Sequence, residues 1–274
     1  DSTFGINGCS KFGLLQPQQQ YVNEIGLQST AKIIVACYNS IAVDQVELHR
    51  LNIDGSYDST FSSFPNFDWS PYTYSNLTVQ PDDKILLTGI SHVNIGGVIS
   101  RFNPDGDIDS SFADFGTCDL STIGPLAQWG LSNIIKTVLL PSGSIVLLDD
   151  APHLVKLTPD GSVDQSFGNG GNLFLMAPFE GLYSITGDSI GNIYVLGYSQ
   201  SVNEIYIAKF DSSGSLDSSF GVSGIGTSNN PLAGGSIHLN KKRMENLLLP
   251  EQLSPQSIAR TACNLMLMGV WKQH

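Results

Sequence analysis

Charged residues are scarce in this chain, and basic residues are the scarcest of them. Lysine and arginine number 13 against 25 acidic residues, so the formal net charge is −12 and the calculated pI is near 4.6. A protein that binds nucleic acid needs a basic surface to neutralise phosphates. The composition therefore excludes nucleic acid as a partner, and it argues equally against binding to an anionic membrane surface.

Long apolar runs and clustered cysteines are also missing. No apolar stretch approaches the roughly 20 residues that a membrane-spanning helix needs, so we expect no membrane insertion. The four cysteines are Cys9, Cys37, Cys118 and Cys263, and none forms a C-x-x-C pair or lies beside a histidine at ligand spacing. We therefore expect no metal site. We interpret the cysteines as mostly buried free thiols, although spacing leaves their disulfide pairing open.

Sequence motifs of catalysis are absent as well. The chain has no G-x-S-x-G, no H-E-x-x-H and no phosphate-binding glycine loop before a helix, and its five histidines are scattered. We expect no cofactor, and the sequence favours a protein without catalytic activity.

A repeated stretch dominates what is present. LNIDGSYDSTF at 51–61 recurs as FNPDGDIDSSF at 102–112, LTPDGSVDQSF at 157–167 and FDSSGSLDSSF at 210–220, and DSTFG at 1–5 is a truncated copy. The closing phenylalanines are 51 to 57 residues apart, and a fixed period of this size indicates a repeat architecture. We call this stretch the signature.

Each period predicts four antiparallel strands. Apolar runs such as 33–36, 85–88, 145–148 and 193–196 predict second strands buried on both faces. A third strand leads into the signature, where Asp-Gly or Ser-Gly predicts a tight turn and the phenylalanine anchors an outer segment. Four such strands per repeat are typical of a β-propeller blade. We predict one all-β domain over residues 1–274, with units of about 5–61, 62–112, 113–167, 168–220 and 221–274 plus 1–4.

The last unit departs from the pattern. Ser236–Leu239, Met244–Leu249 and Asn264–Trp271 match the first three strands, and the N-terminal copy supplies the outer segment. We therefore predict five blades, the last completed by the N-terminal strand, which removes an open sheet edge. The competing interpretation is a fragment of a longer ring.

The signature resembles the bacterial delta-60 repeat family, whose pattern is apolar-x-Arg-apolar-Asn-x-Asp-Gly-Ser-apolar-Asp-x-Ser-Phe-Gly. Arg50 and Arg101 occupy the arginine position, and Lys156 and Lys209 replace it in the next two copies. The resemblance covers about residues 1–226. It implies a propeller that is secreted or surface-associated, and it implies no shared activity.

Two kinds of site are candidates. The repeated aspartates, densest at 103–109, could bind calcium, but no copy has the spacing and terminal glutamate of an EF-hand, and turn formation accounts for all four. A glycosidase would need paired carboxylates on the inner strands. Glu24 is the one acid there; Lys136 occupies the position of Glu24 in its repeat, and His238 occupies the position of Gly26 in the last repeat.

Aromatic residues give the most suggestive signal. Trp69, Tyr72 and Trp129 fall in long connections between blades, and such aromatics suit sugar or peptide binding, or else pack between blades. We therefore predict a monomeric, extracellular or surface-associated binding module for a protein or glycan. The alternatives are a carbohydrate-active enzyme at the channel mouth and a purely structural module of a larger surface protein.

Overall fold

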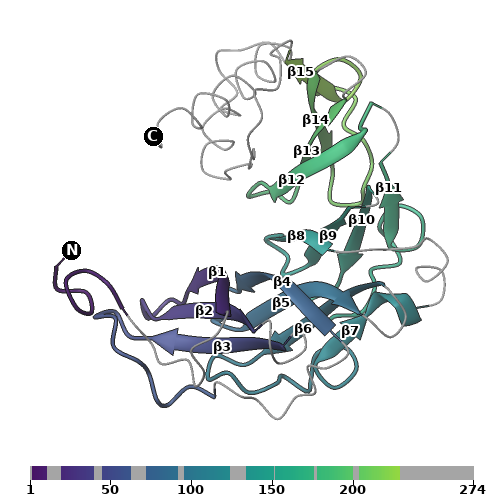
Figure 1. Cartoon of the computed structure of the whole chain (residues 1–274). Helices are drawn as coiled ribbons and strands as arrows, with labels where there is room; N and C mark the ends of the chain where they lie inside the picture. The colour runs from purple at the N-terminus through teal and green to yellow at the C-terminus, as the bar shows by residue number, and fades with distance from the viewer. Residues whose placement is uncertain are drawn as a thin grey trace. The chain divides into compact units, whose positions relative to one another are not determined.

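A computed structural model describes residues 2–10, 20–39, 45–62, 72–91, 96–123, 134–150, 152–175, 178–199 and 204–228. These residues form antiparallel β-sheets, drawn in chain order in Figure 1. By internal contacts the chain divides into two compact units, 1–134 and 135–274. The first unit holds the first two sheets and the second unit holds the other two.

Each sheet takes its strands in sequence order. The first holds β1 (Gln20–Leu27), β2 (Ile33–Asn39) and β3 (Gln45–Leu51). The second holds β4 (Tyr72–Val79), β5 (Ile85–Ser91), β6 (Gly96–Phe102) and β7 (Thr117–Asp119), followed by the 3₁₀ turn η1 (Leu120–Thr122). The third holds β8 (Ile134–Leu139), β9 (Ile145–Asp149), β10 (His153–Leu157) and β11 (Asn172–Phe174). The fourth holds β12 (Gly181–Gly187), β13 (Ile193–Ser199), β14 (Glu204–Phe210) and β15 (Ile225–Ser228).

The second strands are buried on both faces, as their apolar runs predict. Every residue of β9 is buried, and in β5 and β13 all but one residue are buried. Alternate residues of these strands enter the apolar layers on the two sides of the sheet. This burial confirms the prediction that the second strands are buried on both faces.

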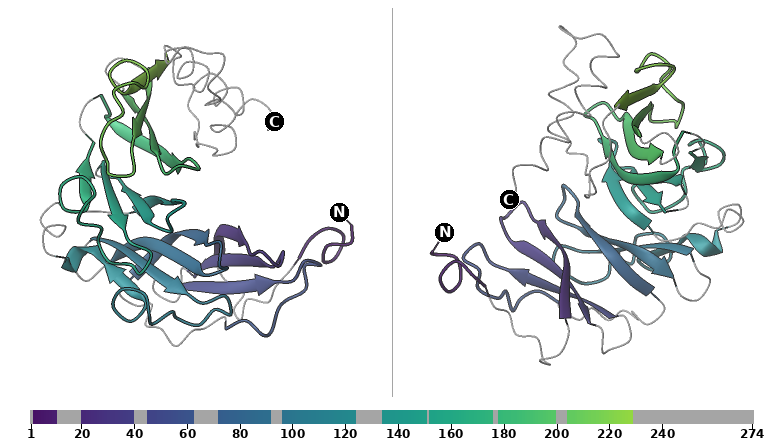
Figure 2. Two further views of the ribbon diagram at one scale, coloured as in Figure 1. Left: turned by 180° about the vertical axis from the view of Figure 1, so that it is seen from behind. Right: turned by 45° about the horizontal axis from the view of Figure 1, so that its top comes forward.

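One apolar layer lies between the two sheets of the first unit. Ile34, Ala36 and Leu48 from the first sheet meet Leu77 and Leu87 from the second. Figure 2 shows these sheets side by side, and β1 and β4 are in contact. The second unit repeats the arrangement, with Leu148 and Leu154 of the third sheet against Val195 of the fourth.

The fourth strand begins after the signature and does not contain its phenylalanine. β7, β11 and β15 each start five residues downstream of Phe112, Phe167 and Phe220. A tight hairpin fills the gap, and its first, third and fourth residues after each phenylalanine have positive φ. The predicted unit boundaries at the phenylalanines therefore separate each signature from its own outer strand.

The N-terminal copy has the same geometry. The backbone N–H of Ile6 donates to Cys9 O at 2.8 Å, as Asn169 donates to Asn172 O at 2.7 Å in the third sheet. Gly5, Asn7 and Gly8 carry the positive φ values of that hairpin. Residues 2–10 thus fold as the segment that precedes a fourth strand. The predicted fifth-blade strands at 236–271 lie outside the described residues, and four sheets are what the structure describes.

Candidate functional site

The signature brings a carboxylate and two cations together at one end of each sheet in the first unit. Asp109 Oδ2 accepts hydrogen bonds from Arg101 Nε at 2.7 Å and Lys84 Nζ at 2.8 Å. Its Oδ1 accepts from Ser111 N at 3.1 Å and Ser111 Oγ at 2.6 Å. Both carboxylate oxygens are therefore engaged within the protein, and the side chain is 7% exposed.

The other copies repeat this arrangement with decreasing burial. Asp58 pairs with Arg50 at 2.8 Å and with Lys32, Asp164 pairs with Lys156 at 3.0 Å, and Asp217 pairs with Lys209 at 2.7 Å. Exposure of the aspartate side chain rises from 5% at Asp58 to 26% at Asp217. The last two copies have one cation each because Ser144 and Asn192 stand where Lys32 and Lys84 stand in the first two.

The cation also contacts the closing phenylalanine. The guanidinium of Arg101 lies 4.4 Å from the centre of the Phe112 ring, and Arg50 lies 4.9 Å from that of Phe61. A cation over a ring face stabilises by about 0.5–2 kcal/mol. One basic residue thus links the third strand, the turn aspartate and the phenylalanine.

These contacts set the protonation of the aspartates. Burial of Asp109 acts to raise its pKa, but hydrogen bonds from Lys84 and Ser111 and the charge of Arg101 outweigh burial and hold the pKa well below its usual range. Hydrogen bonds from Lys209 and Ser219 lower the pKa of Asp217 to about 2. The signature aspartates are thus permanently charged partners of lysine and arginine at neutral pH. This chemistry favours the turn-forming role over calcium binding.

The signature also joins neighbouring sheets, which sequence reasoning missed. A Cβ atom at Gly106 would lie 2.8 Å from the Phe61 ring, and one at Gly214 would lie 3.0 Å from the Phe167 ring. Phe61 and Phe167 therefore pack against the turn glycine of the following sheet in their own unit. The glycine and the phenylalanine recur together in every complete signature, so the sequence shows that both matter. Their spacing does not show that the phenylalanine of one signature contacts the glycine of the next.

Glu24 holds two strands together. It follows a β-bulge in β1, and its Oε2 accepts the backbone N–H of Leu77 on β4 at 2.9 Å. Asn23, the bulged residue, donates to Tyr74 O at 3.2 Å. Glu24 therefore satisfies a backbone group on the inner edge of the second sheet, which accounts for its presence there without catalysis.

Of the other predicted site residues, one lies in the second compact unit, one begins a strand, and three lie outside the described residues. Lys136 lies half-buried on β8, in the compact unit that does not contain Glu24. Tyr72 is the first residue of β4. Trp69, Trp129 and His238 lie outside the described residues, as does the side chain of Tyr72.

The end of each sheet opposite the signature carries the other connections. Strand order places the loop between second and third strands, and the exit to the next sheet, at the end away from the signature. In the third sheet, Asp149 closes this loop by accepting from His153 N at 2.6 Å, while its Oδ2 lies 3.1 Å from His153 Nδ1. We call this end the loop end.

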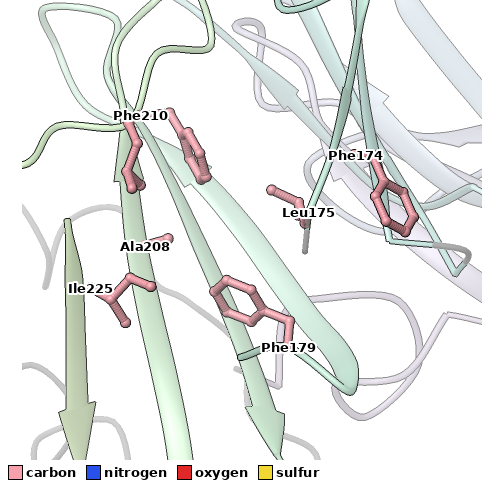
Figure 3. Close-up of a pocket in the computed structure, with 7 residues that line it drawn as sticks. Phe174, Leu175, Phe179, Ala208, Phe210 and Ile225 are labelled. Atoms are coloured by element: carbon pink, nitrogen blue, oxygen red, sulfur yellow. The ribbon is translucent and has the colours of Figure 1, made fainter. Parts of the chain in front are cut away.

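An apolar cavity of about 200 Å³ lies within the second unit. It is lined by Phe174, Leu175, Phe179, Ala208, Phe210, Leu216 and Ile225. Figure 3 shows Leu175 and Phe179 extending from the segment between β11 and β12 toward Ala208 and Phe210 on β14. Because Leu175, Ala208 and Phe210 also belong to the apolar layer of this unit, the cavity is an unfilled part of that layer.

The described cysteines are free thiols. Cys37 and Cys118 are buried and Cys9 is exposed, so the expectation of mostly buried thiols holds for these three. Burial, with a contribution from the charge of Glu47, raises the pKa of Cys37 to about 11. Cys263 lies outside the described residues.

Three segments of the chain match one family model. Residues 80–112, 149–167 and 191–220 match "Domain of unknown function (DUF5122) beta-propeller", and each match includes a signature. These segments are similar to a β-propeller family model, and the four-stranded antiparallel sheets agree with a β-propeller fold. Among the residues that the structure describes, no helix has the length and apolar character to cross a membrane.

Solved structures show distant likeness. A gluconolactonase from Xanthomonas campestris has a TM-score of 0.42 at 12% identity, over 71% of this chain and 60% of its own. Regucalcin, a calcium-binding protein from Agrobacterium tumefaciens, has a TM-score of 0.40 at 11% identity, over 70% and 57%. A Bacteroides thetaiotaomicron protein of unknown function has 0.36 at 13%, over 73% and 47%. The chain thus spans about half to three fifths of each of these proteins. No curated protein matches the sequence.

Proposed function

We propose that this protein is a non-catalytic binding module that presents the loop ends of its sheets to a protein or a glycan. The observation that supports this proposal is a difference between the two ends of each sheet. At the signature end, the aspartates and the basic residues form ion pairs with one another, and the basic residues contact the phenylalanine rings. The loop end carries the connections, which vary in sequence and length between repeats.

The aromatic residues of those connections are the proposed contacts. In the sequence, Trp69 and Trp129 fall between the signature of one repeat and the first strand of the next, and Tyr72 begins β4. Tyrosine and tryptophan give large contact areas with a polar tip, which suits both a peptide and a sugar ring. An enzymatic role is less well supported because the carboxylate of Glu24 accepts a backbone N–H of the neighbouring strand.

The same proposal includes the wider architecture. We infer a delta-60 type propeller of five blades that works as a monomer outside the cell or at its surface. The signature pattern supports the delta-60 assignment, and the periodic matches at 236–271 support a fifth blade. Secretion of the full-length protein into culture medium, followed with an epitope tag, tests the location.

Glycan and peptide arrays test the binding function. Trp69→Ala, Tyr72→Ala and Trp129→Ala should each weaken binding at least about tenfold, since truncation of an aromatic anchor commonly costs 1–2 kcal/mol or more. Ile53→Ala is the matched control, because Ile53 is 72% exposed in the first signature turn. Equal losses from the control, or failure of any array ligand to bind, would contradict the proposal. Turnover of a glycan that stops in Glu24→Gln would instead establish the enzyme alternative.

A further inference from the structure

The apolar cavity of the second unit reaches from the protein surface into the core. The seven described residues that line it are all apolar, and Phe174, Phe179 and Phe210 are aromatic. Figure 3 shows Phe174 on one side of the cavity and Ala208 and Phe210 on the other. Phe174 and Leu216 are 55% and 43% exposed, whereas Ala208 is 1% exposed. The cavity therefore has an entrance that solvent reaches and a buried apolar floor.

The second sheet fills the corresponding place with hydrogen bonds. Ala208 takes the register position that Ser100 has in the second sheet. Ile225 takes the position of Thr117. In the second sheet, Ser100 Oγ lies 2.6 Å from Tyr74 Oη and 2.7 Å from Thr117 Oγ1, and all three side chains are buried. Alanine and isoleucine cannot form such bonds, and the fourth sheet has an apolar cavity there instead.

The aromatic rings of the cavity are held by contacts with other side chains. Phe174 lies opposite His153 across two strands, with the ring centres 5.1 Å apart. His153 is itself held by Asp149, whose Oδ2 lies 3.1 Å from its Nδ1. The ring of Phe179 meets that of Tyr206 edge to face at 6.2 Å. Rings that are already held lose little freedom when a ligand binds, so the cavity is a preformed site.

We propose that this cavity is a binding site for a small uncharged molecule with a single aromatic ring. An apolar cavity of about 150 Å³ is large enough to hold benzene. The cavity of about 200 Å³ therefore has room for a ring with a small alkyl substituent. A water molecule there would lack polar partners among the lining side chains, and an aromatic ligand packs favourably on phenylalanine rings. The inference goes beyond the proposed binding function and does not depend on it.

Calorimetric titration of the full chain with toluene tests the site. Toluene should bind with a Kd of about 1 mM or tighter. Ala208→Leu adds an isopropyl group at the floor of the cavity and should weaken binding at least about tenfold. The matched control is Ile207→Leu, because Ile207 is buried on the opposite face of β14 and keeps its volume in this change. The control should keep the Kd within about twofold of the wild-type value.

Thermal unfolding shows whether Ala208→Leu acts by filling space. The variant should keep or raise Tm, because side-chain atoms added to an empty cavity meet no resistance, whereas overpacking destabilises. A fall in Tm of more than about 5 °C would show that the space is not there and would overturn the proposal.

Phenylacetate tests the chemistry of the ligand. It should bind at least about tenfold more weakly than toluene, because the apolar lining gives its carboxylate no partner. Equal affinity for the two compounds would indicate adsorption elsewhere and would contradict the proposal. No binding of toluene, or equal binding to wild type and Ala208→Leu, would contradict it too. These measurements use neither a glycan nor a peptide, so failure here is separate from failure of the proposed function.

Discussion

The four signature aspartates form a graded series in one chain, and the series predicts unequal costs for one substitution. Asp109 and Arg101 are 7% and 9% exposed at their side chains, and Lys84 adds a second charge. Asp217 and Lys209 are 26% and 20% exposed. Replacement by asparagine keeps the side-chain oxygen that accepts from the turn N–H but removes the negative charge. The experiment therefore isolates the ion pair from the turn.

The expected magnitudes follow from burial. Asp109→Asn leaves the buried guanidinium of Arg101 without its counter-charge, and breaking a buried pair by removing one partner costs about 3–5 kcal/mol. Asp217→Asn removes a pair that water partly screens, and such pairs contribute about 1 kcal/mol or less. Because a domain is stable by only about 5–15 kcal/mol, the first variant should lose a substantial fraction of its folding free energy.

Urea unfolding followed by circular dichroism measures the difference. With a denaturant dependence of about 3 kcal/mol per molar urea, the midpoint should fall by about 1 M or more for Asp109→Asn and by about 0.3 M for Asp217→Asn. Equal shifts would refute the argument from burial. A neutral Asp109→Asn would show that the cluster is not a source of stability at all.

Three further predictions concern the same features. The hydrogen-bonded ion pair with Lys209 lowers the pKa of Asp217 to about 2, below the pKa of an aspartate in an unfolded chain. The stability that Asp217 contributes is therefore complete above about pH 4 and is lost as the pH falls toward about 2. Asp217→Asn should flatten the dependence of the unfolding free energy on pH in that window. Gly106 and Gly143 both have positive φ, so alanine should destabilise both, by about 1 kcal/mol at Gly143. Gly106→Ala should cost more than about 2 kcal/mol in urea unfolding, because a Cβ at Gly106 would also lie 2.6 Å from a backbone oxygen. Equal losses of stability would contradict the packing argument. In a Cys263→Ser background, a thiol reagent at pH 8 should modify Cys9 quickly and Cys37 only on unfolding, and rapid reaction of both would contradict their assigned burial.

Glu24 supplies a control on the enzyme alternative that is independent of any substrate. Glu24→Ala leaves the N–H of Leu77 without its acceptor and should cost about 1–3 kcal/mol of folding free energy. Glu24→Gln retains a carbonyl oxygen at that place, so its cost in urea unfolding should stay below about 1 kcal/mol. A structural acceptor predicts this order, and a residue kept only for acid chemistry predicts no loss from either change.

Much of the architecture follows from local pattern. The apolar runs of the second strands and the turns at Asp-Gly were predictable because strand burial and positive φ leave direct marks on residue choice. The position of the fourth strand was not predicted. It depends on a hairpin in which Phe115 and Ser223 adopt positive φ. Phenylalanine and serine rarely adopt that conformation, so their presence does not predict it.

The candidate site shows the same division. The arginine or lysine, the aspartate and the phenylalanine of each signature can be read as a set from their spacing, and their turn-forming role was predicted from it. Their pairing partners Lys32 and Lys84 could have been suspected from their equal positions in two repeats. Nothing local links Glu24 to Leu77, because 53 residues separate them and only the packing of β1 beside β4 brings them together.

The sequence by itself determined the period, the strand content and the turns of this protein, because each is written in residue types within a single repeat. Tertiary structure alone decided what those residues touch. Phe61 and Phe167 reach the turn glycines of the sheets that follow them, and Glu24 reaches a neighbouring backbone. These outcomes depend on which sheet stands beside which, and contacts between sheets leave no fixed spacing in the chain.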